Sequence, residues 1–158
     1  LLESRGLGDV YKRQVFMKVE NSLYPNHDQM KGFFDNEDDG KPIYMVNLLK
    51  FRDKAEYKDG RETSLTGREA YRLYAEVFEK YLIDLGGEIT FVSEVSRLTI
   101  GKVENLWDSI AIAKWPSKKI MGESMNPNEP HILEAYQHRS AGLEGQLNIE
   151  TKELKSIL

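Results

Sequence analysis

Several side chains in this sequence could bind or transform a small organic molecule. Asn47 is a polar amide in the middle of an apolar run, and Tyr71 and Tyr74 carry hydroxyls about one helical turn apart. His138 and Arg139 are neighbours near the end of a helical pattern. An amide can polarise a carbonyl, a phenol or imidazole can move a proton, and a guanidinium can hold an anion. These residue types therefore predict a site for a small organic substrate, with an anionic group as one option.

Each candidate also has a structural explanation. Asn47 can face a cavity or can satisfy buried backbone groups, and the sequence leaves both open. His138 and Arg139 can interact with the terminal carbonyls of a helix, and the two tyrosines can pack with their hydroxyls at a rim. The predicted catalytic residues are Asn47, Tyr74 and His138. The predicted substrate-binding residues are Arg52, Tyr71, Trp107 and Arg139.

Metal and phosphate chemistry find little support in the sequence. His131 and His138 are seven residues apart, about 10.5 Å along a helix, which is too far for one ion. Gly86 and Gly87 end a helical pattern instead of opening one, so they do not form a phosphate loop. The sequence has no cysteine nucleophile and no Gly-x-Ser-x-Gly elbow. No metal site and no cofactor are expected.

Composition narrows the class of protein and its partners. The 158 residues are 40% apolar and 10% aromatic, which is typical of a globular chain. A net charge of -4 argues against a nucleic-acid partner, and no apolar run of about 18 residues indicates a membrane span. The absence of cysteine favours a reducing, cytoplasmic setting.

The chain divides into three predicted parts. Residues 1–14 lack periodicity and resemble the translation of a library adaptor, so residues 1–16 are expected to be a non-native or disordered leader. Residues 17–41 are expected to form a helical extension, in which Asn26 or Asp28 caps a short helix. Residues 42–158 are expected to form the main domain.

The main domain shows alternating strand and helix patterns. Strands are predicted at 43–52, at 89–100 with a bend, at 107–115 and at 146–153, the last with Leu147 and Ile149 inward. The clearest helix begins at Thr66, which a capping box with Glu69 supports, and two shorter helices follow Ser117 and Asn128. The order predicts an α+β fold of the ferredoxin-like split βαβ type, with a four-stranded antiparallel sheet. The loop at 51–66 is either a lid or an insertion.

The predicted sheet has apolar residues on both faces, but two helices can cover only one face. The uncovered face would carry side chains such as Val46, Leu48, Ile110 and Ile112, or those that alternate with them. A patch of that size is unusual on a monomer. Sheet-against-sheet association is therefore expected, which would give a homodimer of the dimeric α/β-barrel type.

Several sequence blocks resemble the domain-of-unknown-function 1330 family. The similar blocks, which run in the same order, are Val46–Arg52, Gly67–Tyr71 with Tyr74, Gly86-Gly87, Trp107-Asp108, Trp115–Ser117, Asn126-Pro127 and His138–Leu143. The resemblance implies a ferredoxin-like fold, a back-to-back sheet dimer and no settled activity. Members similar to this chain usually carry a tyrosine two residues after the Asn-Pro turn, whereas residues 128–131 here contain none.

Three functional classes follow. The first is a cofactor-independent isomerase, lyase or monooxygenase that acts on a small organic substrate. The second is a homodimer that binds a small ligand, or is structural, without turnover. The third is a haem-degrading protein, which the pairing of Asn47 with Trp107 superficially resembles, but Ser117 stands where such relatives have a histidine. Whether the chain is an enzyme is left open.

Overall fold

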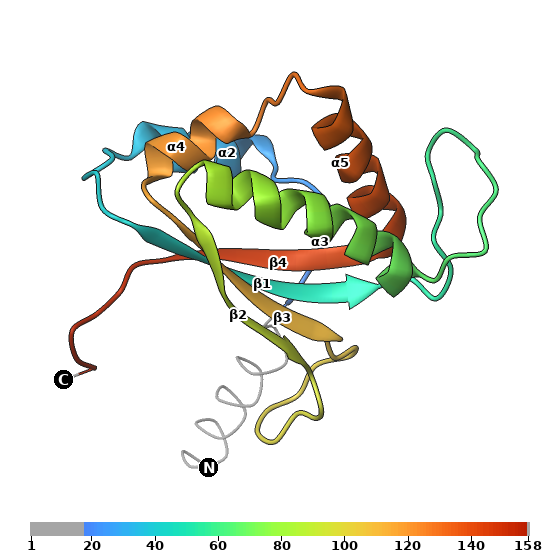
Figure 1. The fold of residues 1–158 in the computed structure, drawn as a ribbon. Helices are drawn as coiled ribbons and strands as arrows, with labels where there is room; N and C mark the ends of the chain where they lie inside the picture. Colours follow the sequence, from blue (N-terminus) through green and yellow to red (C-terminus); the bar gives the residue numbers. More distant parts are fainter. Residues whose placement is uncertain (1–17, 158) are drawn as a thin grey trace, which may run out of the picture.

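The computed structural model describes residues 18–157, and its centre is one antiparallel sheet (Figure 1). The strands are β1 (Ile43–Phe51), β2 (Glu88–Glu94), β3 (Ser109–Trp115) and β4 (Leu143–Thr151), in the order β2-β3-β1-β4. This arrangement confirms the ferredoxin-like fold with a four-stranded sheet. The leader predicted at residues 1–16 lies outside the described residues.

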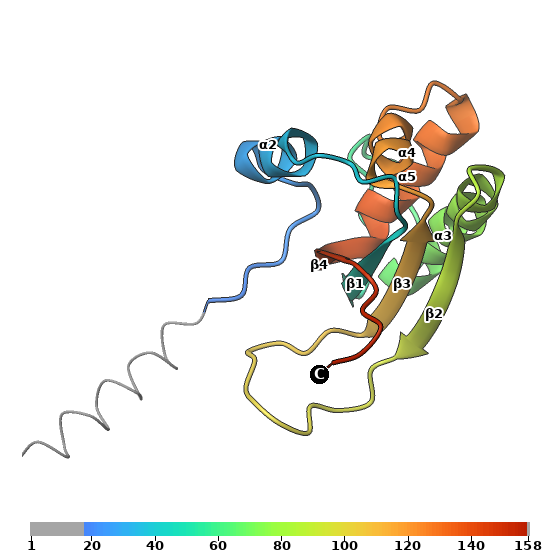
Figure 2. The ribbon, with the colours of Figure 1, turned by 90° about the vertical axis from the view of Figure 1, so that its left-hand side faces the viewer.

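The helices lie on one side of this sheet (Figures 1 and 2). They are α2 (His27–Asp35), α3 (Gly67–Asp84), α4 (Lys118–Ser124) and α5 (Pro130–Gly142). Capping boxes begin α2 at Asn26 and α3 at Thr66, and the Ser117 hydroxyl begins α4, so the expected starts of these three helices are confirmed. Figure 2 shows α2 toward the β4 edge and α3 over the opposite half of the sheet.

Alternate side chains of β1 point to opposite faces of the sheet, one covered by the helices and one left open. Ile43 and Met45 point toward the helices and join Leu82 and Trp115 in the core. The intervening residues point to the open face, where Val46 pairs with Ile112 and Leu48 with Ile110. Among the residues of this outer face, Phe91 and Ile149 keep 50% and 45% of their surface exposed.

Strand pairing corrects two details of the sequence prediction. Leu147 and Ile149 do not point toward the helices, because Leu147 pairs with Leu48 and Ile149 with Val46 on the outer face. The third strand begins at Ser109 and not at Trp107. The Phe51 N–H donates to the Asp108 carboxylate at 2.8 Å, so this side chain takes the place of a backbone partner that a longer strand would provide.

The second strand is shorter than the sequence suggested. β2 ends at Glu94, and Leu98 and Ile100 lie exposed in the connection to β3. Alternating apolar residues therefore did not make a strand here, because no neighbouring strand extends far enough to pair with them.

The loop between β1 and α3 packs against the helices instead of standing free. Ala55 and Tyr57 are buried and form a cluster with Ala70 of α3 and Ala141 of α5. The Ala55 N–H donates to Leu65 O, and the Glu56 N–H donates to Ala141 O, both at 3.0 Å. These contacts hold the loop on the outer side of the helix pair.

A backbone junction joins β1, α3 and α5. The Arg52 N–H donates to Gly142 O at 2.9 Å, and the Gly67 N–H donates to Arg52 O at 3.1 Å. A Cβ added at Gly142 would collide with Gly67 O and approach Tyr71 N at 2.8 Å. Only glycines let the start of α3 and the end of α5 come this close.

We expect Gly142→Ala to lower the free energy of unfolding by about 3 kcal/mol or more, because the new methyl group would meet backbone atoms that cannot move independently. Gly32→Ala is the control: nothing lies within 4 Å of its added Cβ, and alanine favours the helix by about 0.5–1 kcal/mol. Urea unfolding followed by circular dichroism measures both. Equal stability of the two variants would contradict a close-packed junction.

Candidate functional site

A cavity of about 1060 Å³ lies between the helical layer and the covered face of the sheet. Its floor is formed by β1 and β3, its roof by α3 and α5, and its sides by α2, α4 and the segment before α2. Polar residues that line the cavity include Tyr24, Asn47, Tyr71, Tyr74, Tyr136, Arg139, Gln146 and Asn148, together with Arg68, Arg72, Glu79, Ser109, Ser124, Asn126 and Asn128.

Arg139 is a buried cation on this cavity, with only 9% of its surface exposed. Its Nη2 donates to Leu23 O at 2.9 Å, and its guanidinium lies 5.9 Å from the centre of the Tyr24 ring. Within residues 18–157 no carboxylate pairs with it. A buried guanidinium without an anionic partner is costly, and a bound anion would offset that cost.

Three tyrosines lie near enough to this cation for its charge to act on their hydroxyls. Tyr74 is buried, and its ring lies 5.3 Å from that of Tyr71 and 5.7 Å from that of Tyr136. In the described part of the chain none of the three hydroxyls has a hydrogen-bond partner, and Arg52 Nε is the sole sealed polar side-chain atom lacking one. The three hydroxyls therefore keep some accessible surface and are available to bind a ligand in the cavity that these residues line.

Burial raises the pKa of these tyrosines still further above neutral pH. It raises the pKa of Tyr71 to about 12 and that of Tyr74 well above 10, while the nearby Arg139 opposes the rise. Burial also raises the pKa of Tyr136. At neutral pH all three hydroxyls are hydrogen-bond donors, which suits a ligand oxygen that carries negative charge.

Asn47 lies on the cavity floor and is also bonded to the backbone. Its Nδ2 donates to Met45 O at 3.1 Å and to Ala111 O at 3.3 Å. Its Oδ1 accepts Asn148 Nδ2 at 2.7 Å from the neighbouring strand. Asn47 thus combines the two roles that the sequence left open, since it faces the cavity and also satisfies backbone groups. Asn148 is left with an amide oxygen and one N–H for other partners.

The segment before α2 crosses the edge of β4 and closes the cavity beside Arg139. Ser22 and Gln146 exchange two backbone hydrogen bonds at 3.0 Å, and the Tyr24 hydroxyl lies 2.6 Å from Ser140 Oγ. Trp107 holds the same segment from the other side, since its Nε1 donates to Asn21 Oδ1 at 2.8 Å. Trp107 does not line the cavity.

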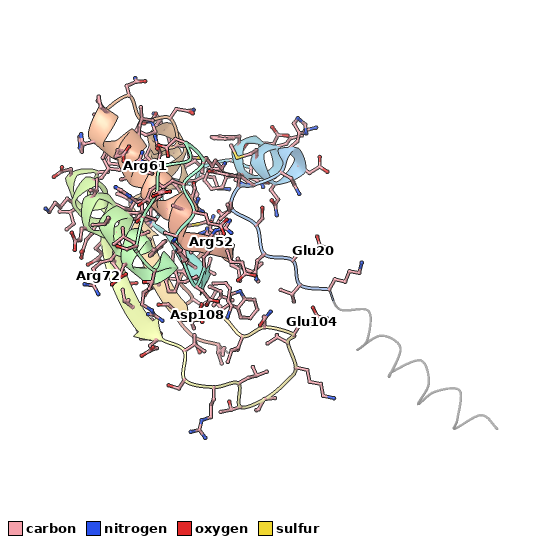
Figure 3. All side chains as sticks on the ribbon, turned by 90° about the vertical axis from the view of Figure 1, so that its right-hand side faces the viewer. Glu20, Arg52, Arg61, Arg72, Glu104 and Asp108 are labelled. Carbon is pink, nitrogen blue, oxygen red and sulfur yellow. The ribbon has the colours of Figure 1, made fainter. Side chains whose placement is uncertain are left out.

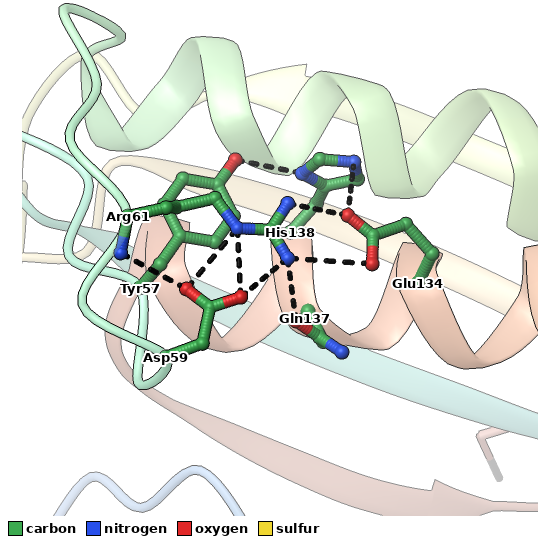
Figure 4. Close-up of polar contacts among 6 residues, drawn as sticks. All are labelled: Tyr57, Asp59, Arg61, Glu134, Gln137 and His138. Atoms are coloured by element: carbon green, nitrogen blue, oxygen red, sulfur yellow. Dashed lines mark hydrogen bonds and ion pairs between the residues drawn. The ribbon is translucent and has the colours of Figure 1, made fainter.

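His138 points away from the cavity into a polar cluster that we call the loop clasp (Figure 4). The residues of the loop clasp are Tyr57, Asp59, Arg61, Glu134, Gln137 and His138. The Tyr57 hydroxyl lies 2.7 Å from His138 Nδ1, and Arg61 binds Asp59 and Glu134 at 2.6 Å each. The clasp fastens the β1–α3 loop to α5.

Arg52 also lies outside the cavity, directly after β1 and beside the β1–α3 loop (Figure 3). Its Nη1 is 3.5 Å from Glu56 Oε2, and its Nε is buried without a partner. Its backbone belongs to the junction with Gly67 and Gly142. Any anion-binding role of Arg52 would therefore be exercised outside the cavity that holds Arg139.

Of the seven predicted site residues, the structure brings four together on one cavity: Asn47, Tyr71, Tyr74 and Arg139. His138, Arg52 and Trp107 lie elsewhere, and their proposed roles stay predictions. Sequence reasoning missed Tyr136 and Asn148. Tyr136 could have been found, because it lies three residues before Arg139 on the same helix face. Asn148 could not, because the register that places it opposite Asn47 is a tertiary feature.

Within residues 18–157 no helix is long and apolar enough to cross a bilayer. No group of three histidine or acidic side chains in that range is arranged to hold a metal ion.

Comparison with solved structures gives close relatives without a known activity. A crystal structure of methylated RPA0582 protein is similar over 89% of this chain and 100% of its own, with 33% identity and a TM-score of 0.77. A second structure of RPA0582, a protein of unknown function from Rhodopseudomonas palustris, gives 31% identity, 87% and 100% coverage and a TM-score of 0.75.

More remote is a dimeric protein of unknown function and ferredoxin-like fold from Bacteroides fragilis, with 10% identity, 71% and 96% coverage and a TM-score of 0.44. No family model and no curated protein matches the chain.

The raised pKa of Tyr71 predicts a loss of stability at high pH. Because the unfolded tyrosine ionises near pH 10 and the folded one near 12, the stabilisation is complete below pH 10 and is lost as pH rises toward 12. We expect the free energy of unfolding to fall between pH 10 and 11.5, and to fall less in Tyr71→Phe. Urea titrations at several pH values measure this.

Tyr24→Phe is the control for this measurement, since the hydrogen bond with Ser140 lowers the pKa of Tyr24. That variant should not reduce the fall in the free energy of unfolding between pH 10 and 11.5. Identical slopes for wild type and Tyr71→Phe would show that burial does not perturb Tyr71.

Proposed function

Since the chain belongs to the family of the RPA0582 protein of Rhodopseudomonas palustris, for which no activity is known, we propose a function from the cavity itself: it binds a small organic carboxylate with an apolar body. The observation that carries this proposal is the buried, unpaired guanidinium of Arg139. A carboxylate is the planar anion that a guanidinium binds best.

The surroundings of Arg139 support the same ligand class. The free hydroxyls of Tyr71, Tyr74 and Tyr136 can donate to carboxylate oxygens that Arg139 does not bind. Most of the other side chains that line the cavity are aromatic or aliphatic, among them Phe78. An apolar enclosure with few convergent polar groups is typical of small-molecule sites.

Turnover is the second candidate, and the position of the neutral tyrosines favours it. With the carboxylate on Arg139, a neighbouring carbonyl could accept a hydrogen bond from Tyr71 or Tyr74, which would stabilise developing negative charge. Among the described residues on the cavity, Glu79 is the one carboxylate available as a base, at an exposed position on α3. Such an arrangement would suit isomerase or lyase chemistry on a carboxylate substrate.

We further propose that this family is the domain-of-unknown-function 1330 family, which the sequence blocks between Val46 and Leu143 resemble. A cytoplasmic location is part of the proposal and rests on the absence of cysteine.

Substitution of Arg139 tests the carboxylate proposal. Phenylacetate should bind the wild-type protein more tightly than neutral phenylacetamide does, and Arg139→Gln should weaken phenylacetate binding by roughly 10-fold to 100-fold, because a charge-assisted hydrogen bond is lost. Isothermal titration calorimetry gives both affinities. The variant should remain folded, since it removes an unpaired buried charge.

The matched control is Arg97→Gln, which neutralises an exposed arginine in the β2–β3 connection. It should leave phenylacetate binding within about twofold, since surface charges contribute little. Equal affinity of the wild-type protein for phenylacetate and phenylacetamide would rule out the carboxylate site.

The outer face of the sheet supports a homodimer. Its apolar side chains, which no helix covers, are Tyr44, Val46, Leu48, Phe91, Ile110, Ile112, Leu147 and Ile149. A second copy of the same face offers a complementary apolar surface, and at about 25 cal/mol per Å² the burial of several hundred Å² per subunit contributes on the order of 10 kcal/mol against the cost of association. We propose that two chains associate through these faces.

Ile110→Asp should produce a monomer or an insoluble protein, because it places a charge in the centre of the proposed interface. Ile83→Asp, at an exposed position on α3 outside this face, is the control and should stay dimeric. Sedimentation equilibrium at micromolar concentration measures the mass of each. A monomeric wild-type protein would refute the dimer.

A further inference from the structure

The cavity has two chemically different ends. The head end is defined by Arg139, Tyr71 and Tyr136. It lies near Leu49 of β1, because Leu49 pairs with Gln146 of β4, and Gln146 binds the segment before α2. The tail end is defined by Met30 of α2, Met45 of β1, Trp115 of β3, Met121 of α4 and Met125 directly after α4. Four of the five methionines of the chain therefore line one end of one cavity.

The tail end, which Ser124 and Asn126 also line, is rich in methionine but incompletely filled by the protein. Phe34 of α2 lines it with 55% of its surface exposed, and no residue of α2 is fully buried. α2 is nevertheless fixed in place: Phe34 lies against Gly122 of α4, where an added Cβ would come within 2.8 Å of the ring. The helix thus presents an apolar surface to the cavity without burying it.

The distance between the two ends sets the length of a ligand that would use both. Leu49 and Met45 are four strand residues apart, about 13 Å at roughly 3.3 Å per residue. An extended carboxylate of about ten carbon atoms covers this distance. The volume of 1060 Å³ exceeds what a single-ring carboxylate needs.

We infer that the ligand is an amphipathic carboxylate with an apolar chain of about eight to twelve carbon atoms, its carboxylate on Arg139 and its chain among the four methionines. This inference rests on the proposed carboxylate site and adds the chain. Methionine side chains are flexible and polarisable, so they follow a flexible chain better than a rigid ring. Burial of the chain also covers the exposed side of Phe34.

Chain length is the direct test. Isothermal titration calorimetry with butanoate, hexanoate, octanoate and decanoate, each below its micelle concentration, should show Kd falling about threefold per added methylene up to decanoate. Decanoate should also shift the methyl resonances of Met30, Met45, Met121 and Met125 in methyl-labelled protein. A Kd that does not change beyond butanoate, or phenylacetate binding as tightly as decanoate, would overturn the inference.

A variant of α2 separates the two ends. Met30→Glu places a charge at the tail end, on a helix without buried residues, and should weaken decanoate binding at least 10-fold while leaving butanoate within about twofold. His27→Glu adds a charge at an exposed position of the same helix and should change neither. Equal loss for butanoate and decanoate in Met30→Glu would contradict a separate tail end.

Octanoate and 1-octanol distinguish a failure of this inference from a failure of the carboxylate site. If Arg139 does not bind the carboxylate, Arg139→Gln will leave the preference for octanoate over octanol unchanged, while Kd still falls with each added methylene. If the chain is bound elsewhere, the preference for octanoate will depend on Arg139, but Kd will not fall with each added methylene.

Discussion

The contact between Gly67 and Gly142 is the constraint on which the rest of the structure depends. Through Arg52, it ties the end of β1 to the first turn of α3 and the last turn of α5 by backbone groups alone. Both helices are fixed at this point, and Leu82 packs the other end of α3 against Ile43 and Trp115 of the sheet. The cavity lies between these fixed helices and the covered face of the sheet.

The same junction determines the electrostatic character of the site. Tyr71 and Arg139 belong to the helical turns that the glycines bring together, so the phenol and the guanidinium are held close in a region with little water. In such surroundings a cation strengthens its interaction with any anion, and a phenol stays protonated. The Tyr71 hydroxyl and part of the Arg139 guanidinium thus remain as hydrogen-bond donors without an acceptor among the described residues of the protein, and a ligand oxygen would supply that acceptor.

Sequence reasoning reached the fold because the periodicities of β1 and α3 are strong and their caps are explicit. It failed where the outcome depends on partners: Leu98 and Ile100 alternate but have no strand beside them, and Leu147 and Ile149 follow the register of β1. It also assigned His138 and Arg139 to one site, although adjacent residues on a helix point about 100° apart. The structure shows the result, with Arg139 on the cavity and His138 in the loop clasp.

One contact of Arg139 has a consequence for comparisons among relatives. The guanidinium is held by the main-chain oxygen of Leu23 and not by a side chain. Every amino acid offers that oxygen, so position 23 can change identity during evolution without disturbing the arginine, provided that the segment keeps its path across β4. Covariation between aligned sequences would therefore give no signal for this contact, and the length of the segment between Ser22 and α2 would be the property under selection.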